Sequence, residues 1–382
     1  MKMLLLTQQY PKHSNKYRNG FVHSRVKAYV SKGYDVEVLV YDRKIKEAVL
    51  YEYEGVKVKE VNSYDLAKVI ETSAYNIICI HFALRRMTEI VLKHKSPDMK
   101  IIVWVHGYEA LNFKRRTFNL SFETLRDYIY IPLDYFSNLK QLIFFRKLIT
   151  NQNEFNTHFV FVSEWMKKVT ETDTKTVGSI KNYSIIPNPI NTEIFSYEKK
   201  TEKDRLKIFN LRPYGRSKKY ANDITIKVIK KLSEEPFFEN LVFNLYGNGE
   251  RFEEITNEVK EFSNVNLYKG FLNQREIKEA HNQNGILLMP TRQDAQGVSM
   301  CEAICSGLVP IVSNNTAIPE FADEEFGYLC SNVKDYAEAI KELYYNSSSF
   351  LEKSKNTKKL ANRISNNVII NEELDLIDKL II

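Results

Sequence analysis

The stretch of residues 285–312 constrains the fold most, because it reads as a complete strand, loop, helix and second strand. Its first part is the apolar run Ile286–Met289, which is typical of a buried strand. A polar loop with Gly297 follows, and the next helix should end near Ser306, since Gly307 suits the C′ position. Residues 309–313 form the second predicted strand. The loop and the helix start would lie at the carboxyl end of a strand, where open α/β sheets bind ligands.

Two carboxylates mark this predicted site, Asp294 in the loop and Glu302 in the helix. Ser299 and Glu302 fit a capping box, with the hydroxyl at the N-cap and the carboxylate at N3. Free N–H groups and the helix dipole favour a phosphate there, and a carboxylate accepts hydrogen bonds from sugar hydroxyls. Together these preferences describe a nucleotide-sugar. The alternative is that Glu302 only caps its helix and Asp294 is a solvated loop residue.

Composition is that of a soluble globular protein with two domains. The chain has 382 residues, of which 43% are hydrophobic and 27% charged. A net charge of +7 suits an anionic ligand or membrane surface but is too small to indicate nucleic acid. The four cysteines follow no metal-ligand or secretory spacing, and we expect neither a signal peptide nor a membrane span. These features predict a cytoplasmic protein with reduced thiols.

The first half also opens with a strand, loop, helix and strand. Residues 3–6 and 35–41 are the predicted strands, and the helix between them should begin at Gly20. The unit lacks the pattern G-x-G-x-x-G, which disfavours a dinucleotide site. The alternative reading of Gly20 is an ordinary loop-to-helix turn.

Two apolar runs, residues 76–81 and 100–105, predict further buried parallel strands. A histidine stands at the end of each, His81 and His106. His106 is well placed to donate to a sugar hydroxyl or a phosphate oxygen, whereas we interpret His81 as structural. A structural role is the alternative for His106 as well.

Residues 111–156 mix basic clusters with aromatic residues. A basic, aromatic-flanked helix can lie on an anionic bilayer, so this segment could make peripheral membrane contact. The alternative is a set of amphipathic helices that cover the N-terminal sheet.

The chain resembles the retaining glycosyltransferases of family 4, which have the GT-B fold. The acidic-x7-Glu signature is matched by Asp294 and Glu302, although the family usually has glutamate at the first position. Residues 106–109 (HGYE) are similar to the family's HG-x-[ED], and residues 186–195 (IPNPINTEIF) to the segment that ends its N-terminal domain.

The resemblance implies an α/β protein of GT-B fold, with two Rossmann-like domains facing a central cleft. Residues 1–196 would form the acceptor domain and residues 205–365 the donor domain, with the C-terminal helix at 366–382 crossing back onto the first. It also implies roles for particular residues. His106 and Asp294 would act on the transferred sugar, and the implied donor-binding residues are Gly20, Arg212, Lys219, Leu272, Gly297, Val298, Ser299 and Glu302. Arg216 and Lys218 compete with Arg212 and Lys219 as the diphosphate clamp, and a solvated basic loop is the alternative.

The implied activity is a retaining, metal-independent transfer of a hexosyl or N-acetylhexosaminyl group from a nucleoside diphosphate sugar, with UDP favoured. The acceptor would be a glycan, a lipid-linked sugar or a protein in bacterial surface polysaccharide or glycoconjugate synthesis. No cofactor, metal or nucleic acid is expected, and the protein would be cytoplasmic, with peripheral contact at the inner face of the membrane. The alternatives are a glycoside hydrolase that uses Asp294 and Glu302, a non-catalytic nucleotide-sugar-binding partner of another transferase, and a sugar-nucleotide epimerase.

Overall fold

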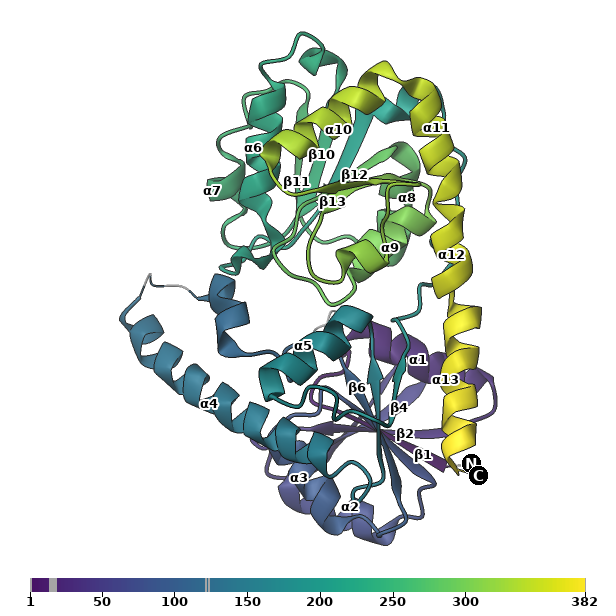
Figure 1. The fold of residues 1–382 in the computed structure, drawn as a ribbon. Coiled ribbons are helices and arrows are strands. Elements are labelled where there is room, and N and C mark those ends of the chain that lie inside the picture. Colours follow the sequence, from purple (N-terminus) through teal and green to yellow (C-terminus); the bar gives the residue numbers. More distant parts are fainter. Residues whose placement is uncertain (1, 14–18, 121, 123, 382) are drawn as a thin grey trace. The chain divides into compact units, whose positions relative to one another are not determined.

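The computed structural model describes residues 2–13, 19–120, 122 and 124–381. The chain divides into two compact units (Figure 1). The first contains Met1–Arg115, Tyr130–Pro189 and Asn367–Ile382, and the second contains Arg116–Ile129 and Ile190–Asn366.

The first unit is built on an eight-stranded sheet with the order β3-β4-β2-β1-β5-β6-β7-β8. Its strands are β1 (Lys2–Thr7), β2 (Asp35–Tyr41), β3 (Val49–Tyr53), β4 (Val56–Val61), β5 (Ile77–His81), β6 (Lys100–Val105), β7 (Thr157–Phe161) and β8 (Tyr183–Ile185). All neighbouring strands are parallel except β3, which pairs antiparallel with β4. The central strands are apolar runs with both faces covered, as parallel sheets require.

The helices of this unit are α1 (Gly20–Ser31), α2 (Ser63–Thr72), α3 (Arg85–His94), α4 (Leu125–Thr150), α5 (Glu164–Thr174) and α13 (Asn366–Ile381). Ser163 begins α5 as a side-chain cap, because its hydroxyl accepts from the N–H of Met166 at 3.1 Å. A 3-10 helix, η1 (Phe113–Asn119), precedes α4.

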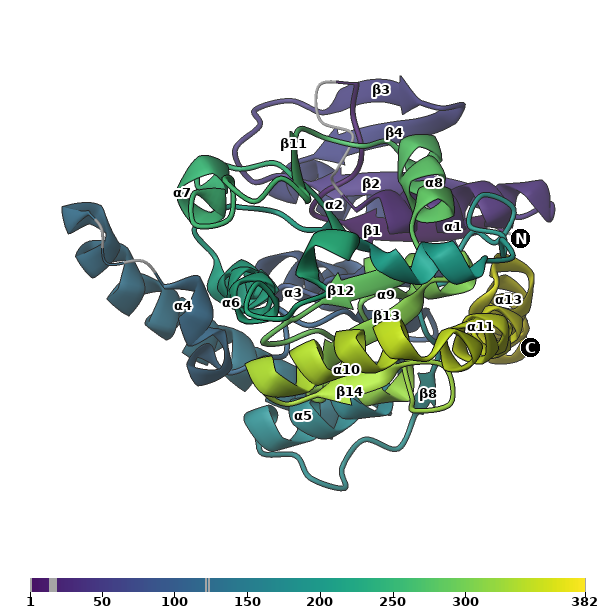
Figure 2. The same ribbon diagram turned by 90° about the horizontal axis from the view of Figure 1, so that it is seen from above.

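The β3–β4 hairpin is an edge of the first sheet that the sequence analysis missed. Figure 2 shows both strands beyond β2. Glu54 and Gly55 form its turn, with φ of 45° and 81°. A two-residue turn with positive φ at both positions is type I′, the turn that matches the twist of a hairpin.

The second unit is built on six parallel strands with the order β11-β10-β9-β12-β13-β14. They are β9 (Lys207–Leu211), β10 (Val242–Gly247), β11 (Val265–Lys269), β12 (Ile286–Met289), β13 (Val309–Ser313) and β14 (Tyr328–Cys330). The helices are α6 (Asn222–Leu232), α7 (Phe252–Thr256), α8 (Gln274–Gln283), α9 (Val298–Cys305), α10 (Val333–Tyr345), α11 (Ser347–Asn356) and α12 (Lys358–Ile364), with 3-10 turns η2 (Glu202–Leu206), η3 (Lys218–Tyr220), η4 (Phe238–Asn240) and η5 (Ile318–Glu320).

The strand order of the second sheet reverses between β9 and β12. From β9 the chain builds outward through β10 and β11, and it then returns to add β12, β13 and β14 on the other side. Open α/β sheets bind ligands at such a switch point, outside the carboxyl ends of the strands. The loops that follow β9 and β12 are therefore the candidate site of this unit.

Two sheets of mostly parallel strands with helical crossovers confirm the predicted α/β class. Within the described part of the chain, no helix has both the length and the apolar character that crossing a membrane requires.

Candidate functional site

Arg212 lies at the switch point, one residue after the end of β9. Its side chain is only 3% exposed, and its Nη2 donates to the carbonyl oxygen of Pro290, which follows β12, at 3.2 Å. Its Nε has no hydrogen-bond partner among the residues that the structure describes. Burial lowers the pKa of Arg212, and the nearby Asp294 carboxylate partly offsets this. A buried cation with an unused donor is suited to an anion.

Lys219 and Arg212 both lie near the aromatic ring of Tyr220. The guanidinium of Arg212 and the Nζ of Lys219 lie 5.4 Å and 5.5 Å from the centre of the Tyr220 ring. Arg216, a competitor for the diphosphate role, instead pairs with Glu250 at 2.9 Å on the surface. The geometry therefore favours Arg212 with Lys219 as the pair of cations at this edge.

The loop after β12 ends at Gly297, which has φ of 79° and is the N-cap of α9. The left-handed conformation favours glycine, and a Cβ here would also lie 3.3 Å from the Cδ1 of Ile318. Val298 and Ser299 are the first residues of the helix, so their N–H groups have no partner within it. Such N–H groups at a helix start can bind an anion, and the predicted contact with a phosphate stays a prediction.

The predicted capping box of Ser299 with Glu302 is wrong. Gly297 begins the helix without a side-chain cap, and the hydroxyl of Ser299 instead lies 3.9 Å from the sulfur of Met289. The reason is that Gly297 can adopt the left-handed conformation, which starts the helix one residue before Ser299. The predicted helix end is confirmed: the N–H of Gly307 donates to Ile304 and that of Leu308 to Ala303, which is a Schellman motif.

Glu302 is therefore released from a capping role. Burial raises its pKa to about 8, so a large share of this carboxyl is protonated at pH 7. Asp294 accepts from the N–H of Ala295 at 2.9 Å within its own loop. Both carboxylates lie close enough to the Cys301 thiol to raise its pKa, after the larger effects of burial and Cys305. The structure thus brings the two predicted acids to the same end of α9.

Leu272 follows β11, the edge strand of this sheet, in the loop between β11 and α8. It is partly buried and directly precedes Asn273, which caps α8 by accepting from Arg275 and Glu276. The rings of Tyr246 and Tyr268 stack at 4.5 Å on the neighbouring strands β10 and β11. This aromatic surface was not singled out from the sequence.

In the first unit, the buried His81 forms a hydrogen bond with the partly buried His106. The Nδ1 of His81 and the Nε2 of His106 are 3.0 Å apart, and the rings stack. Burial holds the pKa of both well below its usual value, with a further lowering from the charge of Arg25. Both imidazoles are therefore neutral near pH 7. His81 was interpreted as structural, but it is the hydrogen-bond partner that orients His106.

Aromatic side chains pack against the ring of His106, and Glu109 accepts hydrogen bonds from the backbone around it. Phe82 and Phe21 pack against it at 4.6 Å and 5.0 Å between ring centres. The carboxylate of Glu109 accepts from the N–H of His106 at 2.6 Å and from that of Gly107 at 3.1 Å, and burial raises the pKa of Glu109 to about 7. The Nδ1 of His106 is buried and has no partner within the described ranges. Because this nitrogen is enclosed by its neighbours, a contact between His106 and a sugar stays a prediction.

Gly20 begins α1, as predicted. A Cβ at this position would meet nothing within 4 Å, so packing inside the protein does not require a glycine. A role in close approach to a ligand stays a prediction.

Sequence reasoning missed Arg25, which is fully buried beneath the histidine pair. Its Nε donates to Glu373 on α13 at 2.8 Å, and its Nη1 donates to the Oδ1 of Asn188 at 3.0 Å. Tyr29 donates to the other oxygen of Glu373. This ion pair fastens α13 to α1, which lie together in Figure 1. An arginine at an apolar helix position carries no sequence signal of its own.

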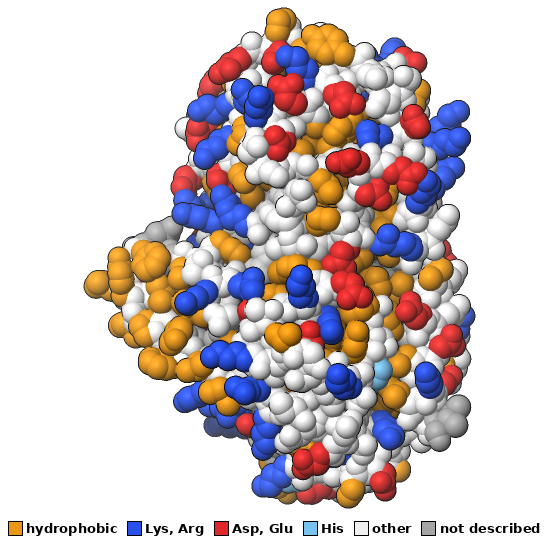
Figure 3. Space-filling model, viewed as in Figure 1, with side chains coloured by type: hydrophobic (Ala, Val, Ile, Leu, Met, Phe, Trp, Pro, Cys, Tyr) orange, Lys and Arg blue, Asp and Glu red, His pale blue; other side chains and the backbone are white. Residues whose placement is uncertain are grey.

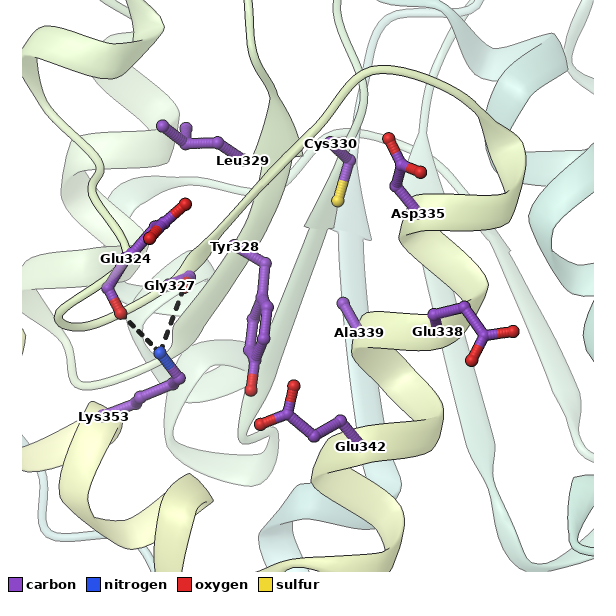
Figure 4. Close-up of a pocket in the computed structure, with 10 residues that line it drawn as sticks. All are labelled: Glu324, Gly327, Tyr328, Leu329, Cys330, Asp335, Glu338, Ala339, Glu342 and Lys353. Atoms are coloured by element: carbon purple, nitrogen blue, oxygen red, sulfur yellow. Dashed lines mark hydrogen bonds between the residues drawn. The ribbon is translucent and has the colours of Figure 1, made fainter.

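A cavity of about 570 Å³ lies elsewhere in the second unit, between β14, α10 and α11 (Figure 4). Four of its ten lining residues are acidic and none is a predicted site residue: Glu324, Gly327, Tyr328, Leu329, Cys330, Asp335, Glu338, Ala339, Glu342 and Lys353. Across the described ranges, no group of three or more His, Cys, Asp or Glu side chains is arranged to hold a metal ion.

Comparison with known proteins identifies the second unit. Residues 195–367 match the family model of the glycosyl transferases group 1. An uncharacterized 41.2 kDa protein in the cps region of Klebsiella pneumoniae is 28% identical over 141 residues, which span 36% of each chain. The match thus covers about a third of that relative's length.

Solved structures resemble the whole chain. Sucrose-phosphate synthase from Thermosynechococcus elongatus has a TM-score of 0.73 at 12% identity, covering 100% of this chain and 99% of that one. HepE from Anabaena, in complex with UDP and glucose, has a TM-score of 0.67 at 12% identity, with 99% and 100% covered. A glycosyltransferase from Rickettsia africae has a TM-score of 0.69 at 12% identity, with 99% and 98% covered. The chain therefore has the predicted GT-B fold, and its residues 195–367 are similar to the glycosyl transferases group 1.

Proposed function

We propose that this protein is a glycosyltransferase that moves a hexosyl or N-acetylhexosaminyl group from a nucleoside diphosphate sugar to an acceptor hydroxyl. The observation that carries the proposal is the buried Arg212, with its unused Nε, beside Lys219 at the switch point of a group 1 domain. Two cations at the carboxyl edge of the sheet match the two negative phosphates of such a donor. UDP is the favoured nucleotide, and the similar HepE structure contains UDP and glucose.

The donor residues divide by the part of the molecule they would contact. Arg212, Lys219 and the N–H groups of Val298 and Ser299 would hold the diphosphate. Glu302 would accept from the ribose hydroxyls, and Leu272 would line the base.

Two side chains would contact the transferred sugar. Asp294 would accept hydrogen bonds from its hydroxyls, and His106 would form a hydrogen bond with one of its oxygens. Gly20 would allow the start of α1 to approach the donor phosphates.

The proposed reaction is retaining and needs no metal, as in glycosyltransferase family 4. The bond between the anomeric carbon and the diphosphate oxygen breaks, and the acceptor oxygen bonds to the anomeric carbon on the same face. The proton of the acceptor hydroxyl passes to the departing diphosphate. Arg212 and Lys219 stabilise the charge that develops on this leaving group, which lowers the barrier because they are positioned before the reaction begins.

A glycan, a lipid-linked sugar or a protein is the proposed acceptor, in the synthesis of a bacterial surface polysaccharide or glycoconjugate. The partial likeness to a protein of a cps region supports this assignment, and a cytoplasmic location would supply the nucleotide-sugar.

A two-step experiment tests the proposal. A thermal-shift screen of nucleoside diphosphates and their sugars should show a stabilising ligand, and that donor should then be turned over with an acceptor. NMR of the product should show that the anomeric configuration of the donor is kept. Release of nucleotide and free sugar without any acceptor would indicate a hydrolase, and binding without turnover across an acceptor panel would indicate a non-catalytic partner.

A further inference from the structure

Helix α4 carries a row of exposed apolar side chains that no part of the described chain covers. Leu125, Pro132 and Leu139 are spaced seven residues apart, as are Ile129, Phe136 and Ile143, and the two series are offset by four. Side chains with this spacing share one face of a helix. All six are exposed, with exposed fractions of 43–86% for the five non-proline residues. We call these six residues the α4 seam.

The opposite face of α4 already has its partner. Leu142, Phe145 and Leu148 are buried in the first unit. Gln141 donates to the carbonyl oxygens of Ala83 and Glu109 and accepts from the N–H of Arg85, which fastens the second half of the helix. The seam is therefore a second apolar face of α4. It is exposed to solvent, while the opposite face packs against the first unit. Figure 3 shows hydrophobic side chains gathered over the outer end of α4.

Charged residues around α4 are sorted by face. Arg126, Lys140 and Lys147, at intervals of seven or fourteen residues, run along one border of the seam. Arg146, seven residues after Leu139, continues the first seam series at its C-terminal end. Asp127 and Asp134 lie on the face opposite the seam. Tyr128 and Tyr135, both exposed, follow the other border. An apolar stripe bordered by bases and tyrosines, with its acids turned away, is the pattern of a helix in the interface of a bilayer.

We propose that the α4 seam binds the surface of a membrane that contains anionic phospholipid. The seam would enter the boundary of the acyl chains, and the bordering bases would remain among the headgroup phosphates. A helical protein partner fits less well. Pro132 lies within the seam and disfavours knobs-into-holes packing, and two antiparallel copies would bring the row of Arg126, Lys140 and Lys147 against the same row. This proposal concerns a binding surface of the protein, and it holds whether or not the protein is the proposed transferase.

Flotation of the full-length protein with vesicles tests the proposal. The protein should float with vesicles of phosphatidylglycerol and phosphatidylcholine at low salt, and less with phosphatidylcholine alone. Phe136→Ser combined with Ile143→Ser should weaken this binding at least about tenfold, because two exposed apolar contacts are lost. Leu50→Ser with Val177→Ser removes equally exposed apolar residues from other surfaces and should leave it unchanged.

Charge and apolar contact are tested separately. Lys140→Gln and Lys147→Gln should each weaken binding to the anionic vesicles about fivefold and leave binding to phosphatidylcholine unchanged. Binding of the nucleoside diphosphate should be the same in all of these variants, which separates failure of this proposal from failure of the transferase activity.

Two results would overturn the proposal. One is that the wild-type protein and the seam variant float to the same extent, or that neither of them floats. The other is a wild-type dimer in light scattering that the seam variant converts to a monomer, because the seam would then be covered by a second copy.

Discussion

Each unit contains a buried arginine near the carboxyl edge of its sheet, and the two arginines differ in their partners. Arg25 in the first unit donates to the carboxylate of Glu373 at 2.8 Å. The hydrogen bond of Arg212 in the second unit goes to the carbonyl oxygen of Pro290, and its Nε has no partner in the described part of the chain. The two arginines differ in charge compensation, because Arg25 is paired with a carboxylate whereas the hydrogen bond of Arg212 goes to a neutral carbonyl. Each has one guanidinium nitrogen without a partner in the described part of the chain, Nη2 of Arg25 and Nε of Arg212.

The other groups at the carboxyl edges of the two sheets also differ in charge. In the first unit the edge presents His81 and His106, both neutral because burial lowers their pKa, among aromatic rings. In the second unit the edge presents Lys219 and the N–H groups at Gly297. One unit therefore suits hydroxyls and the other suits phosphates. The same strand–helix architecture provides both positions, and the loops determine the chemistry.

The largest expected effect tests whether Arg25 is structural. Arg25→Ala should lower the free energy of unfolding by about 3–5 kcal/mol, because it leaves the buried Glu373 carboxylate without its partner. Urea denaturation measures this. Arg25→Met combined with Glu373→Met should recover most of the loss, since neither charge then remains. A cost for Arg25→Ala no larger than that of Arg212→Ala would contradict the comparison.

Glu302→Ala should reduce kcat/KM at least about a hundredfold, or about 2.7 kcal/mol, through lost donor contacts. Steady-state kinetics with the donor found in the thermal-shift screen provides the measurement. Glu325→Ala removes an exposed carboxylate that pairs with Lys359 and serves as the control. Kinetics like those of the wild-type protein would remove Glu302 from the site.

Arg212→Ala and Lys219→Ala should each raise the Kd for the nucleoside diphosphate about ten- to thirtyfold, because each removes a charge-assisted hydrogen bond. Calorimetry measures the Kd. Arg216→Ala, whose side chain pairs with Glu250, should change it less than about twofold, as expected for an exposed ion pair. A larger rise in Kd for Arg216→Ala than for Arg212→Ala and Lys219→Ala would indicate that Arg216 binds the diphosphate instead.

The smallest effect concerns the pH dependence of the donor site. The pKa of Glu302 in the empty site is raised to about 8, so ionisation above this pH provides a carboxylate that can accept two ribose hydrogen bonds. Affinity for the nucleotide should therefore rise about three- to tenfold between pH 6 and 9, and Glu302→Gln should abolish the rise. Because the pKa of Glu302 is about 8 in the folded protein and 4.5 in the unfolded chain, the stability of the ligand-free protein should fall from about pH 4.5 to about pH 8. A flat affinity profile in the wild-type protein would contradict this.

Patterns that depend on neighbouring residues were predictable from the sequence. The strands β2, β6 and β13 have the predicted bounds, because apolar runs between turn residues determine buried strands. The helix end at Gly307 and the start of α1 at Gly20 were predicted for the same local reasons. The unit of β12, α9 and β13 was also predicted, whereas the pairing of β12 with β9 is seen only in the structure.

Features that depend on distant contacts were not predictable. The pairing of Arg25 with Glu373 joins residues 348 positions apart, and the bond between His81 and His106 joins two strand ends. The capping box failed because Gly297 could begin the helix earlier than Ser299. The hairpin of β3 and β4 was missed because Glu54, a residue type rare at positive φ, occupies its turn.

A crystal structure of the protein with bound UDP tests the central claim most directly. The diphosphate should lie against the Nε of Arg212 and the N–H groups that follow Gly297, with the ribose beside Glu302. A diphosphate bound in the acidic cavity beside Tyr328, or beside the neutral histidines of the first unit, would contradict the account.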